Sequence, residues 1–469
     1  MTEPALPPAA RVPRPRPLAQ LGYLRRLFSA PHQSLDDLAA EFGPICQLGA
    51  GPFRLVILGD PAMLQQMFAM KVDDFRWNHR FNAVGVKFVV GPGSMIVSDG
   101  DDHRRRRTPA QGAFTRQRLN EWIPMILERT DAAIERALHD ATSARISIAP
   151  ASAAIDLGPI VSDLILGVTV RAFFGERLAA RAAEIGALEG QLQDFIEAPA
   201  VRQLPHPFPF TARARVRAAR RQLDRIVDDE IAERRARPSG DPHDVLEALV
   251  ADGTLSDAEM RDQVMTLIGA GFDTTSAVLM WAMWCATLLP GAWQQLRDEA
   301  DAVFGGVTGE VGPLEVGPHE LAQLEYAGRV IHETLRLHPA GAVGARQTAR
   351  AIRLGDVEVP AGTLLIWSPH LAGRDASSWD DPLRFDPDRF LDPTPEHRAA
   401  QQRAWIPFGR GAHGCIGFAL AQMELTLMLA RIAQRLDLQP TSAETPPPVG
   451  MVVNRPLGGA PFVVSARSV

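Results

Sequence analysis

The chain has 469 residues, 46% of them hydrophobic, and a formal net charge of −6. This length and composition suit a large folded protein with a sizeable core, and the negative charge argues against general nucleic-acid binding. The three cysteines, Cys46, Cys285 and Cys415, are far apart in sequence. Such an odd and sparse set predicts no disulfide framework and favours a reducing cytoplasm.

The N-terminal part predicts a leader followed by a hairpin. Residues 1–17 are rich in proline and arginine, so we expect a flexible, polyproline-like leader that is neither a signal peptide nor an anchor. Residues 45–48 and 53–58 are apolar and flank a glycine-rich turn, which predicts two paired strands. The longest apolar run, residues 277–289, is shorter than the roughly 18 residues of a bilayer span, so we expect no transmembrane anchor.

Most of residues 115–340 has the pattern of helices. Residues 224–235 and 292–304 show amphipathic spacing with pairs of acids and bases. The glycine-rich residues 305–318 predict a loop. Strand signals return at residues 343–368. We therefore expect a mainly α protein with a small β region, in which residues 18–469 form a single large domain.

The helix expected from residue 256 to residue 290 has an unusual centre. It begins at a capping box, in which Ser256 is followed three residues later by Glu259. In its middle, Gly269 and Gly271 each cost about 1 kcal/mol relative to alanine. Asp273 and Thr274 lie in an apolar run and need hydrogen-bond partners. Taken alone, this segment fits a kink or a close helix crossing as well as it fits a functional site.

Residues 408–417 carry the most specific pattern in the chain. Four glycines and Cys415 precede a long apolar helix pattern. A cysteine at a loop-to-helix junction lies among unpaired N–H groups at the positive end of a helix dipole, which favours the thiolate. Glycines allow close approach to a flat object. A thiolate facing an iron-bearing macrocycle fits the segment, and a buried structural cysteine beside a glycine turn is the alternative.

This ten-residue frame resembles the haem-binding loop of the cytochromes P450, and the segments at 100–107, 269–275, 333–339 and 385–390 match that family in order. The resemblance implies the cytochrome P450 fold and haem b (iron protoporphyrin IX), with Cys415 as the iron ligand and Phe408 and Gly409 near the sulfur. It assigns the haem propionates to His103, Arg107, Arg346 and His413.

The same resemblance implies further roles. Ala270 and Gly271 would let the distal helix lie flat on the haem, Thr274 would donate a hydrogen bond to dioxygen, and Asp273 would relay protons. A buried network of Glu333, Arg336 and Arg389 would hold the cysteine loop. An apolar substrate pocket with no charged anchor would be lined by Ala342, Val343, Met451 and Val452.

The implied function is a monooxygenase that inserts one oxygen atom from O2 into a terpenoid, steroid or fatty acyl substrate. Electrons would come from a separate ferredoxin, flavodoxin or flavoprotein reductase, and the protein would be a cytoplasmic monomer. We expect the electron donor to dock on a basic patch formed by Arg104, Arg105, Arg106, Arg116, Arg118 and Arg410. The alternatives are a peroxide-driven peroxygenase, against which the Asp273–Thr274 pair argues, and a non-catalytic haem sensor.

Overall fold

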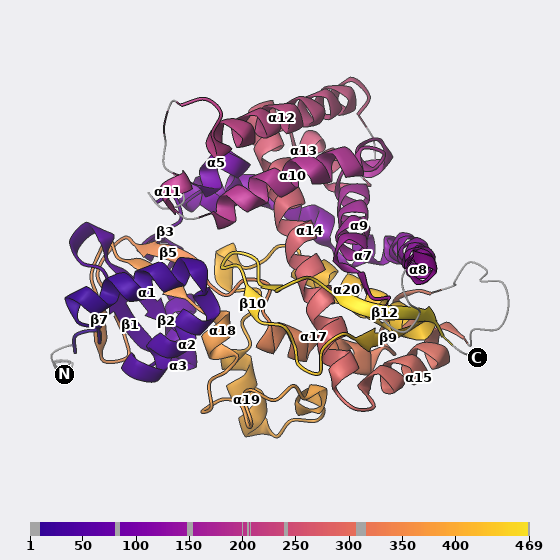
Figure 1. Ribbon diagram of the computed structural model, residues 1–469. Helices are drawn as coiled ribbons and strands as arrows, with labels where there is room; N and C mark the ends of the chain where they lie inside the picture. The colour runs from indigo at the N-terminus through magenta and orange to yellow at the C-terminus, as the bar shows by residue number, and fades with distance from the viewer. Residues whose placement is uncertain are drawn as a thin grey trace.

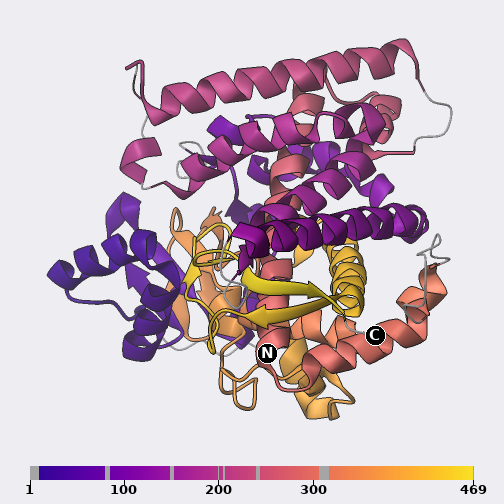
Figure 2. The ribbon, with the colours of Figure 1, turned by 45° about the vertical axis from the view of Figure 1, so that its right-hand side comes forward.

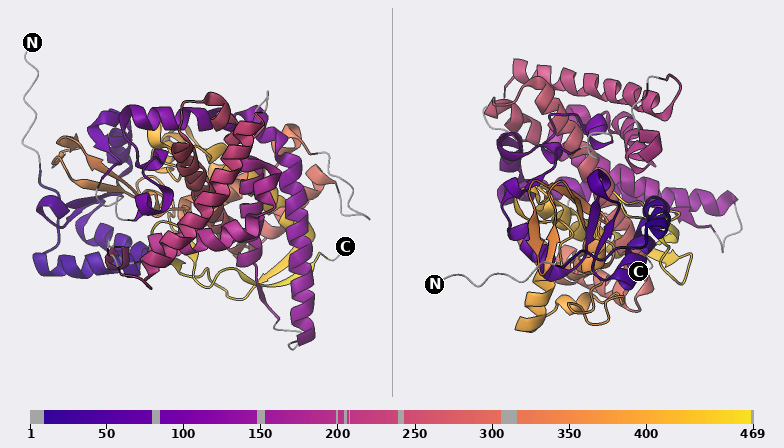
Figure 3. Two further views of the ribbon diagram at one scale, coloured as in Figure 1. Left: turned by 90° about the horizontal axis from the view of Figure 1, so that it is seen from above. Right: turned by 90° about the vertical axis from the view of Figure 1, so that its left-hand side faces the viewer.

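The computed structural model describes residues 10–79, 85–147, 153–198, 200–203, 206, 208–238, 243–305 and 316–467. A strand-rich part and a larger helical part lie side by side (Figures 1 and 3). Much of the loop expected at residues 305–318 lies outside the described residues.

The strand-rich part is built on a five-stranded sheet in the order β1-β2-β8-β5-β3. β1 and β2 form the predicted antiparallel hairpin, and β8 adds to β2 in parallel. A two-stranded ribbon of β6 and β7 lies nearby. The bounds are α1 Pro17–Ser29, α2 Pro31–Phe42, β1 Ile45–Leu48, β2 Leu55–Leu58, α3 Pro61–Ala69, β3 Phe75–Arg76, β5 Gly344–Thr348, β6 Ile352–Leu354, β7 Val357–Val359, β8 Leu364–Trp367 and α18 Pro369–Ala372.

The leader prediction is wrong for residues 10–16. The N–H of Ala10 donates to the carbonyl of Asp356 at 2.9 Å, and the carbonyl of Pro13 accepts from the N–H of Gln47 at 2.8 Å. Val12 is buried in the core of the sheet region. A segment that satisfies edge backbone groups in this way is held in place despite its proline content. Residues 1–9 lie outside the described residues.

The helical part surrounds one long central helix, α14 (Figures 1 and 2). In Figure 1, α9, α10, α12 and α13 lie around the upper part of α14, and α15, α17 and α20 lie toward its lower part. The bounds are α5 Val86–Val90, α6 Gly100–Gln111, α7 Arg116–Glu121, α8 Ile123–Ser147, α9 Gly158–Ala179, α10 Ala182–Glu197, α11 Ala200–Gln203, α12 Ala212–Ala236, α13 Val245–Asp252, α14 Asp257–Leu288, α15 Ala292–Phe304, α16 Pro318–Leu321, α17 Glu325–Leu337, α19 Pro395–Ala404 and α20 Phe418–Arg435.

Two small sheets near the C-terminus complete the fold. β4 (Ile155–Asp156), β12 (Pro461–Ala466) and β9 (Leu436–Pro440) form a three-stranded sheet in that order. The short hairpin of β10 (Pro448–Val449) and β11 (Arg455–Pro456) approaches α14. This hairpin places residues 448–456 against the central helix.

The capping box at Ser256 is confirmed. The Ser256 hydroxyl accepts from the Glu259 N–H at 3.3 Å, and the Glu259 carboxylate accepts from the Ser256 N–H at 3.2 Å.

Among the described residues, α9 and α14 are long and apolar enough to cross a membrane, but both are mostly buried inside the protein. Their apolar character is that of core helices.

Candidate active site

The cysteine loop runs from Phe408 into the N-terminus of α20. The Cys415 N–H donates to the Phe408 carbonyl at 2.8 Å, and the Gly414 N–H donates to the Gly411 carbonyl at 2.9 Å. Gly409 has φ +62° and Gly411 has φ +76°, a backbone region that L side chains rarely adopt. The expectation of positive φ in this loop is confirmed at these two positions. The Phe408 ring packs edge-to-face against Trp405, with ring centres 5.9 Å apart.

Electrostatics at Cys415 differ from the sequence-based expectation. The sulfur is accessible in a recess, but the surrounding atoms shield it from bulk water. This desolvation raises the pKa of the Cys415 thiol, although the Gly417 N–H and the Arg107 guanidinium lower it. The loop alone therefore does not favour the thiolate as expected, because desolvation outweighs the N–H and the cation. A bound metal cation would supply the positive charge that a thiolate needs.

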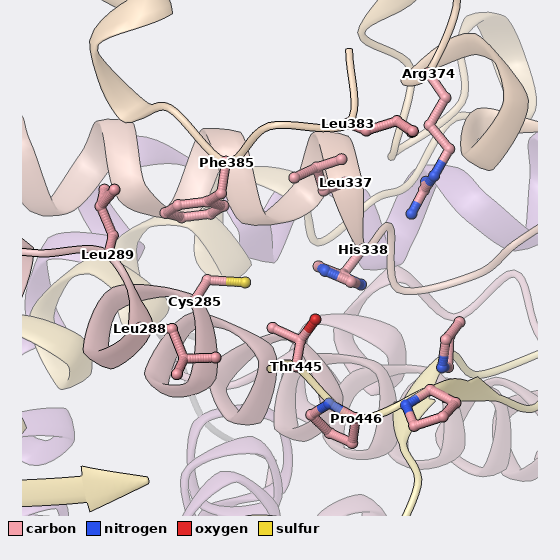
Figure 4. A pocket seen from close by; sticks show the side chains of 12 residues that line it. Cys285, Leu288, Leu289, Leu337, His338, Arg374, Leu383, Phe385, Thr445 and Pro446 are labelled. Atoms are coloured by element: carbon pink, nitrogen blue, oxygen red, sulfur yellow. The ribbon is translucent and has the colours of Figure 1, made fainter. Parts of the chain in front are cut away.

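The other two cysteines have different surroundings. Cys285 in α14 lines a pocket together with Leu288, Leu289 and Phe385 (Figure 4). Burial raises the pKa of Cys285, and it raises the pKa of Cys46 to about 12. Buried thiols of this kind are inert. Of the three cysteines, only Cys415 is exposed.

Three rings form a continuous stack beside the cysteine loop. His413 lies between Trp77 and His103, with ring-centre distances of 3.5 and 3.6 Å. Arg346 in β5 also lies close to Trp77, with its guanidinium carbon 5.2 Å from the centre of that ring. The structure thus brings together three of the four residues assigned to the haem propionates, and Trp77 joins them.

The polar groups of this cluster fit a bound anion. The Nε atom of Arg346 and the Nε2 atom of His413 are buried and have no hydrogen-bond partner among the described residues. Burial lowers the pKa of Arg346 to about 10. An unpaired buried donor costs about 1–3 kcal/mol. A carboxylate such as a haem propionate would satisfy both groups, so the residues present fit the cofactor.

Arg107, the fourth residue, is aimed at the cysteine loop. Its guanidinium donates to the Gly414 carbonyl at 2.8 Å. Arg107 and His103 lie on one face of α6, as the spacing of four residues predicts. In the described structure, Arg107 therefore tethers α6 to the residue that precedes Cys415.

The glycines of α14 serve different purposes. Ala270 is exposed, and its neighbours Gly269 and Thr274 are partly exposed in an otherwise buried helix, so this stretch borders an open space. A Cβ at Gly271 would lie 3.0 Å from the Cγ2 atom of Thr169 in α9. The helix-crossing interpretation therefore accounts for Gly271, whereas Ala270 faces the opening.

The Asp273–Thr274 pair is held by protein partners. The Thr274 hydroxyl donates to the Ala270 carbonyl at 2.6 Å, which leaves its oxygen lone pairs free to accept. The Asp273 carboxylate pairs with Arg455 in β11, with Nε and Oδ1 3.2 Å apart. Burial raises the pKa of Asp273, and Arg455 opposes this shift. In this structure the Thr274 hydroxyl hydrogen is used inside the helix, and its donation to dioxygen stays a prediction.

Glu333, Arg336 and Arg389 form a buried network. Glu333 Oε2 and Arg336 Nε are 2.7 Å apart, and Arg389 Nε lies 2.9 Å from Glu333 Oε1. Both side chains of the first pair are fully buried. The remaining N–H groups of Arg336 donate to Glu333 and to the carbonyls of Gly373, Pro382 and Arg384. All five N–H donors of the guanidinium are therefore used.

Replacing Glu333 with glutamine should destabilise the protein strongly. The substitution leaves two arginines without their counter-charge, at a cost of about 3–5 kcal/mol. We expect a lower thermal midpoint and poor haem incorporation, measured by circular dichroism and by the haem absorbance per protein. Glu325→Gln is the matched control, because Glu325 is exposed at the start of the same helix. Equal midpoints for Glu333→Gln and the parent would contradict the role of the network.

The four residues assigned to the substrate pocket fall into two groups. Ala342 is fully buried in a core cluster with residues of the five-stranded sheet, so it occupies a core position rather than a pocket wall. Val343 packs against the same cluster. Met451 and Val452 lie in the loop between β10 and β11. Glu197 at the end of α10 accepts hydrogen bonds from the N–H groups of Met451 and Val453 at 3.2 and 2.8 Å, which ties this loop to α10.

Two important residues were not predicted from sequence. Arg455 is 182 positions from Asp273, and no local pattern marks it as a partner. Trp77 stacks on His413, and its aromatic ring was a signal that could have suggested stacking on a histidine. Both pairings depend on contacts between distant parts of the chain.

Comparison with known proteins identifies the family. The family model for cytochrome P450 matches residues 11–459. Putative cytochrome P450 139 of Mycobacterium tuberculosis is 31% identical over 85% of this chain and 88% of its own length. Cyclooctatin synthase of Streptomyces melanosporofaciens is 32% identical over 90% and 88%, and pentalenene oxygenase of Streptomyces avermitilis is 30% identical over 91% of each chain.

A solved structure, retinoic acid bound cyanobacterial CYP120A1, has the same fold, with a TM-score of 0.82 and 21% identity over 99% of this chain and 100% of that chain. The family match covers the cysteine loop, the α14 segment and the buried arginine network together. The chain therefore belongs to the cytochrome P450 family and is a haem-dependent monooxygenase.

Proposed function

We propose that this monooxygenase hydroxylates terpenoid substrates in the cytoplasm, with electrons from a separate NAD(P)H-dependent redox partner. The observation that supports the proposal is a partly exposed Thr274 next to a buried Asp273 on α14, in a chain whose exposed Cys415 lies in the loop before α20. An acid and an alcohol at an open stretch of a core helix supply protons where the pocket excludes bulk water.

The overall reaction consumes the substrate, O2, two electrons and two protons. One oxygen atom enters a C–H bond to give an alcohol, and the other leaves as water. Haem, when bound through Cys415, supplies the site at which dioxygen is reduced. Arg346 and His413 would bind its carboxylates, because their buried nitrogen atoms need acceptors.

The chain's own residues control proton supply. Thr274 accepts a hydrogen bond from water in the pocket, because its own hydrogen is donated to Ala270. Asp273 exchanges protons with that water when its ion pair with Arg455 opens. Desolvation, which raises the pKa of Asp273, brings the carboxyl closer to the range in which it can both take up and release a proton.

The terpenoid class is supported by the relatives. Three similar proteins are named cyclooctatin synthase, pentalenene oxygenase and cyclooctat-9-en-7-ol 5-monooxygenase, and each is 30% identical or more. Similarity at this level supports a substrate class rather than a particular molecule. Steroid and fatty acyl substrates are the alternatives within the same chemistry.

The basic patch predicted as the docking surface for the electron donor contains arginines that form ion pairs within the protein. Arg105 and Arg106 pair with Glu259, and Arg104 pairs with Asp101 at 2.7 Å. Arg116 is exposed, and no ion pair is recorded for it among the described residues. We therefore place the basic docking contact at Arg116, where an unpaired charge can steer an acidic carrier.

The proposal is tested by turnover with a surrogate reductase. NADPH consumption coupled to the loss of a cyclic terpene supports it. Product formation that needs hydrogen peroxide and proceeds without NADPH favours a peroxygenase. Haem reduction without any substrate loss across a terpene, steroid and fatty acid panel favours a sensor.

A further inference from the structure

A second buried acid lies against the distal helix. Glu189 in α10 is only 3% exposed. Its Oε2 atom lies 3.6 Å from the position that a Cβ would have at Gly269, immediately before the exposed Ala270. In the view of Figure 1, α10 crosses α14. Because Gly269 has no side chain, the carboxyl group comes close to the helix where the helix borders the open space.

Among the described residues, one oxygen of the Glu189 carboxyl group is left without a hydrogen-bond partner. Its Oε1 atom is buried and makes no hydrogen bond, and no ion pair involves Glu189 among the residues described. Arg220, the cation that acts electrostatically on Glu189, is already paired with Asp224 and Asp262 at 2.6 and 2.7 Å. A buried acceptor left in this state costs about 1–3 kcal/mol unless something else satisfies it.

The surroundings of Glu189 favour the protonated, neutral form of its carboxyl group. Burial raises its pKa to about 8, the nearby Asp273 adds to this shift, and Arg220 opposes it. Asp194 and Glu197 on α10 contribute further negative charge to the surroundings of Asp273, and Arg455 contributes positive charge. A protonated carboxyl group offers one O–H donor and free acceptor sites. This combination matches an alcohol, which is also both donor and acceptor.

We propose that Glu189 determines specificity by hydrogen-bonding a hydroxyl group that the substrate already carries. The inference rests on the proposed terpenoid monooxygenase and names its substrate class more closely, as an oxygenated terpenoid rather than a hydrocarbon. A site built to bond a hydroxyl group rejects the analogue that lacks it, because the buried carboxyl then stays unpaired. Glu189 touches the substrate in this account and takes no part in proton delivery.

The test compares bornane with borneol, a rigid terpenoid pair that differs by one hydroxyl group. Their dissociation constants are measured by equilibrium dialysis with the haem-loaded full-length protein, and bornylamine is the cationic third probe. In Glu189→Leu, the preference for borneol over bornane should fall about tenfold relative to the parent, the effect of a hydrogen bond worth ~1.4 kcal/mol. Glu189→Gln should keep most of the preference, because an amide can also donate and accept.

Glu424→Gln is the matched control. Glu424 in α20 is also 3% exposed, and burial raises its pKa to about 8, but its carboxyl bonds Thr275 instead of facing α10. The ratio of the dissociation constants for bornane and borneol should be the same in Glu424→Gln as in the parent. If Glu189→Leu keeps the parent's ratio of the two dissociation constants, the proposal is overturned. The proposal is also overturned if the variant loses more affinity for bornylamine than for borneol, because Glu189 would then bind a cation rather than a hydroxyl group. Equilibrium dialysis measures binding without turnover. A failure of the monooxygenase reaction therefore appears in the turnover assay and not in these dissociation constants.

Discussion

Replacing Cys415 with alanine should abolish the thiolate-type carbon monoxide spectrum of the ferrous protein and reduce turnover to background. The sulfur is accessible in the recess formed by the Phe408–Phe418 loop, and thiolate ligation gives cytochromes of this type their characteristic chemistry. The carbon monoxide difference spectrum after dithionite reduction is the deciding measurement. A spectrum that keeps its thiolate band in Cys415→Ala would show that the iron ligand lies elsewhere.

The other two cysteines provide controls of the same chemical type. Cys46→Ala and Cys285→Ala each remove a buried thiol whose pKa is raised by burial. Cys285 lines the separate pocket in Figure 4. Both variants should keep the parent spectrum, at a modest cost in stability from the lost packing.

Replacing Thr274 with alanine should leave haem binding intact but separate electron use from product formation. Without the hydroxyl oxygen, water in the pocket loses an acceptor and proton delivery becomes disordered. We expect product per NADPH to fall about tenfold, the value of a hydrogen bond worth ~1.4 kcal/mol, with the lost electrons recovered as hydrogen peroxide and water. Product, NADPH and peroxide are measured in the same reaction.

Ser276→Ala is the matched control for this effect. The Ser276 hydroxyl donates to the Phe272 carbonyl at 2.6 Å, the same intrahelical bond that Thr274 makes, but it is buried away from the opening. The amount of product per NADPH should be the same in Ser276→Ala as in the parent. If Thr274→Ala also keeps the parent's product per NADPH, Thr274 has no part in proton supply, whatever happens to the overall rate.

Local patterns predicted the parts of the fold that local forces determine. The capping box at Ser256 and the hairpin at β1 and β2 depend on residues a few positions apart, and both are present. The positive φ values at Gly409 and Gly411 follow from glycine itself. The spacing of Glu333 and Arg336 likewise fixes one ion pair within a single helix turn.

Long-range contacts explain what the sequence could not show. Asp273 is paired with Arg455 because the C-terminal hairpin folds back onto α14. In the sequence, Glu189 has the pattern of one polar residue of an amphipathic helix. Its burial close to Gly269, with one carboxyl oxygen that has no hydrogen-bond partner, is known only from the folded structure. The proposed role of Glu189 as a polar anchor therefore has no counterpart among the predictions made from sequence.

Burial also changes the electrostatics that sequence reasoning assigns. A helix N-terminus lowers the pKa of a thiol in an exposed position, but desolvation at Cys415 is larger than the effect of the Gly417 N–H. In the same way, the basic run at residues 104–106 is mostly neutralised by Glu259 and Asp101, which lie within reach only in the folded chain.

The most direct test of the central claim is isotope labelling. The haem-loaded protein is supplied with NADPH, a surrogate reductase, a cyclic terpenoid alcohol and 18O2, and the product is examined by mass spectrometry. The account predicts a product that contains a single labelled oxygen atom, with label also appearing in water. A product without label, or one whose label comes from water in the reverse experiment, would contradict the assignment of this chain as an O2-dependent terpenoid hydroxylase.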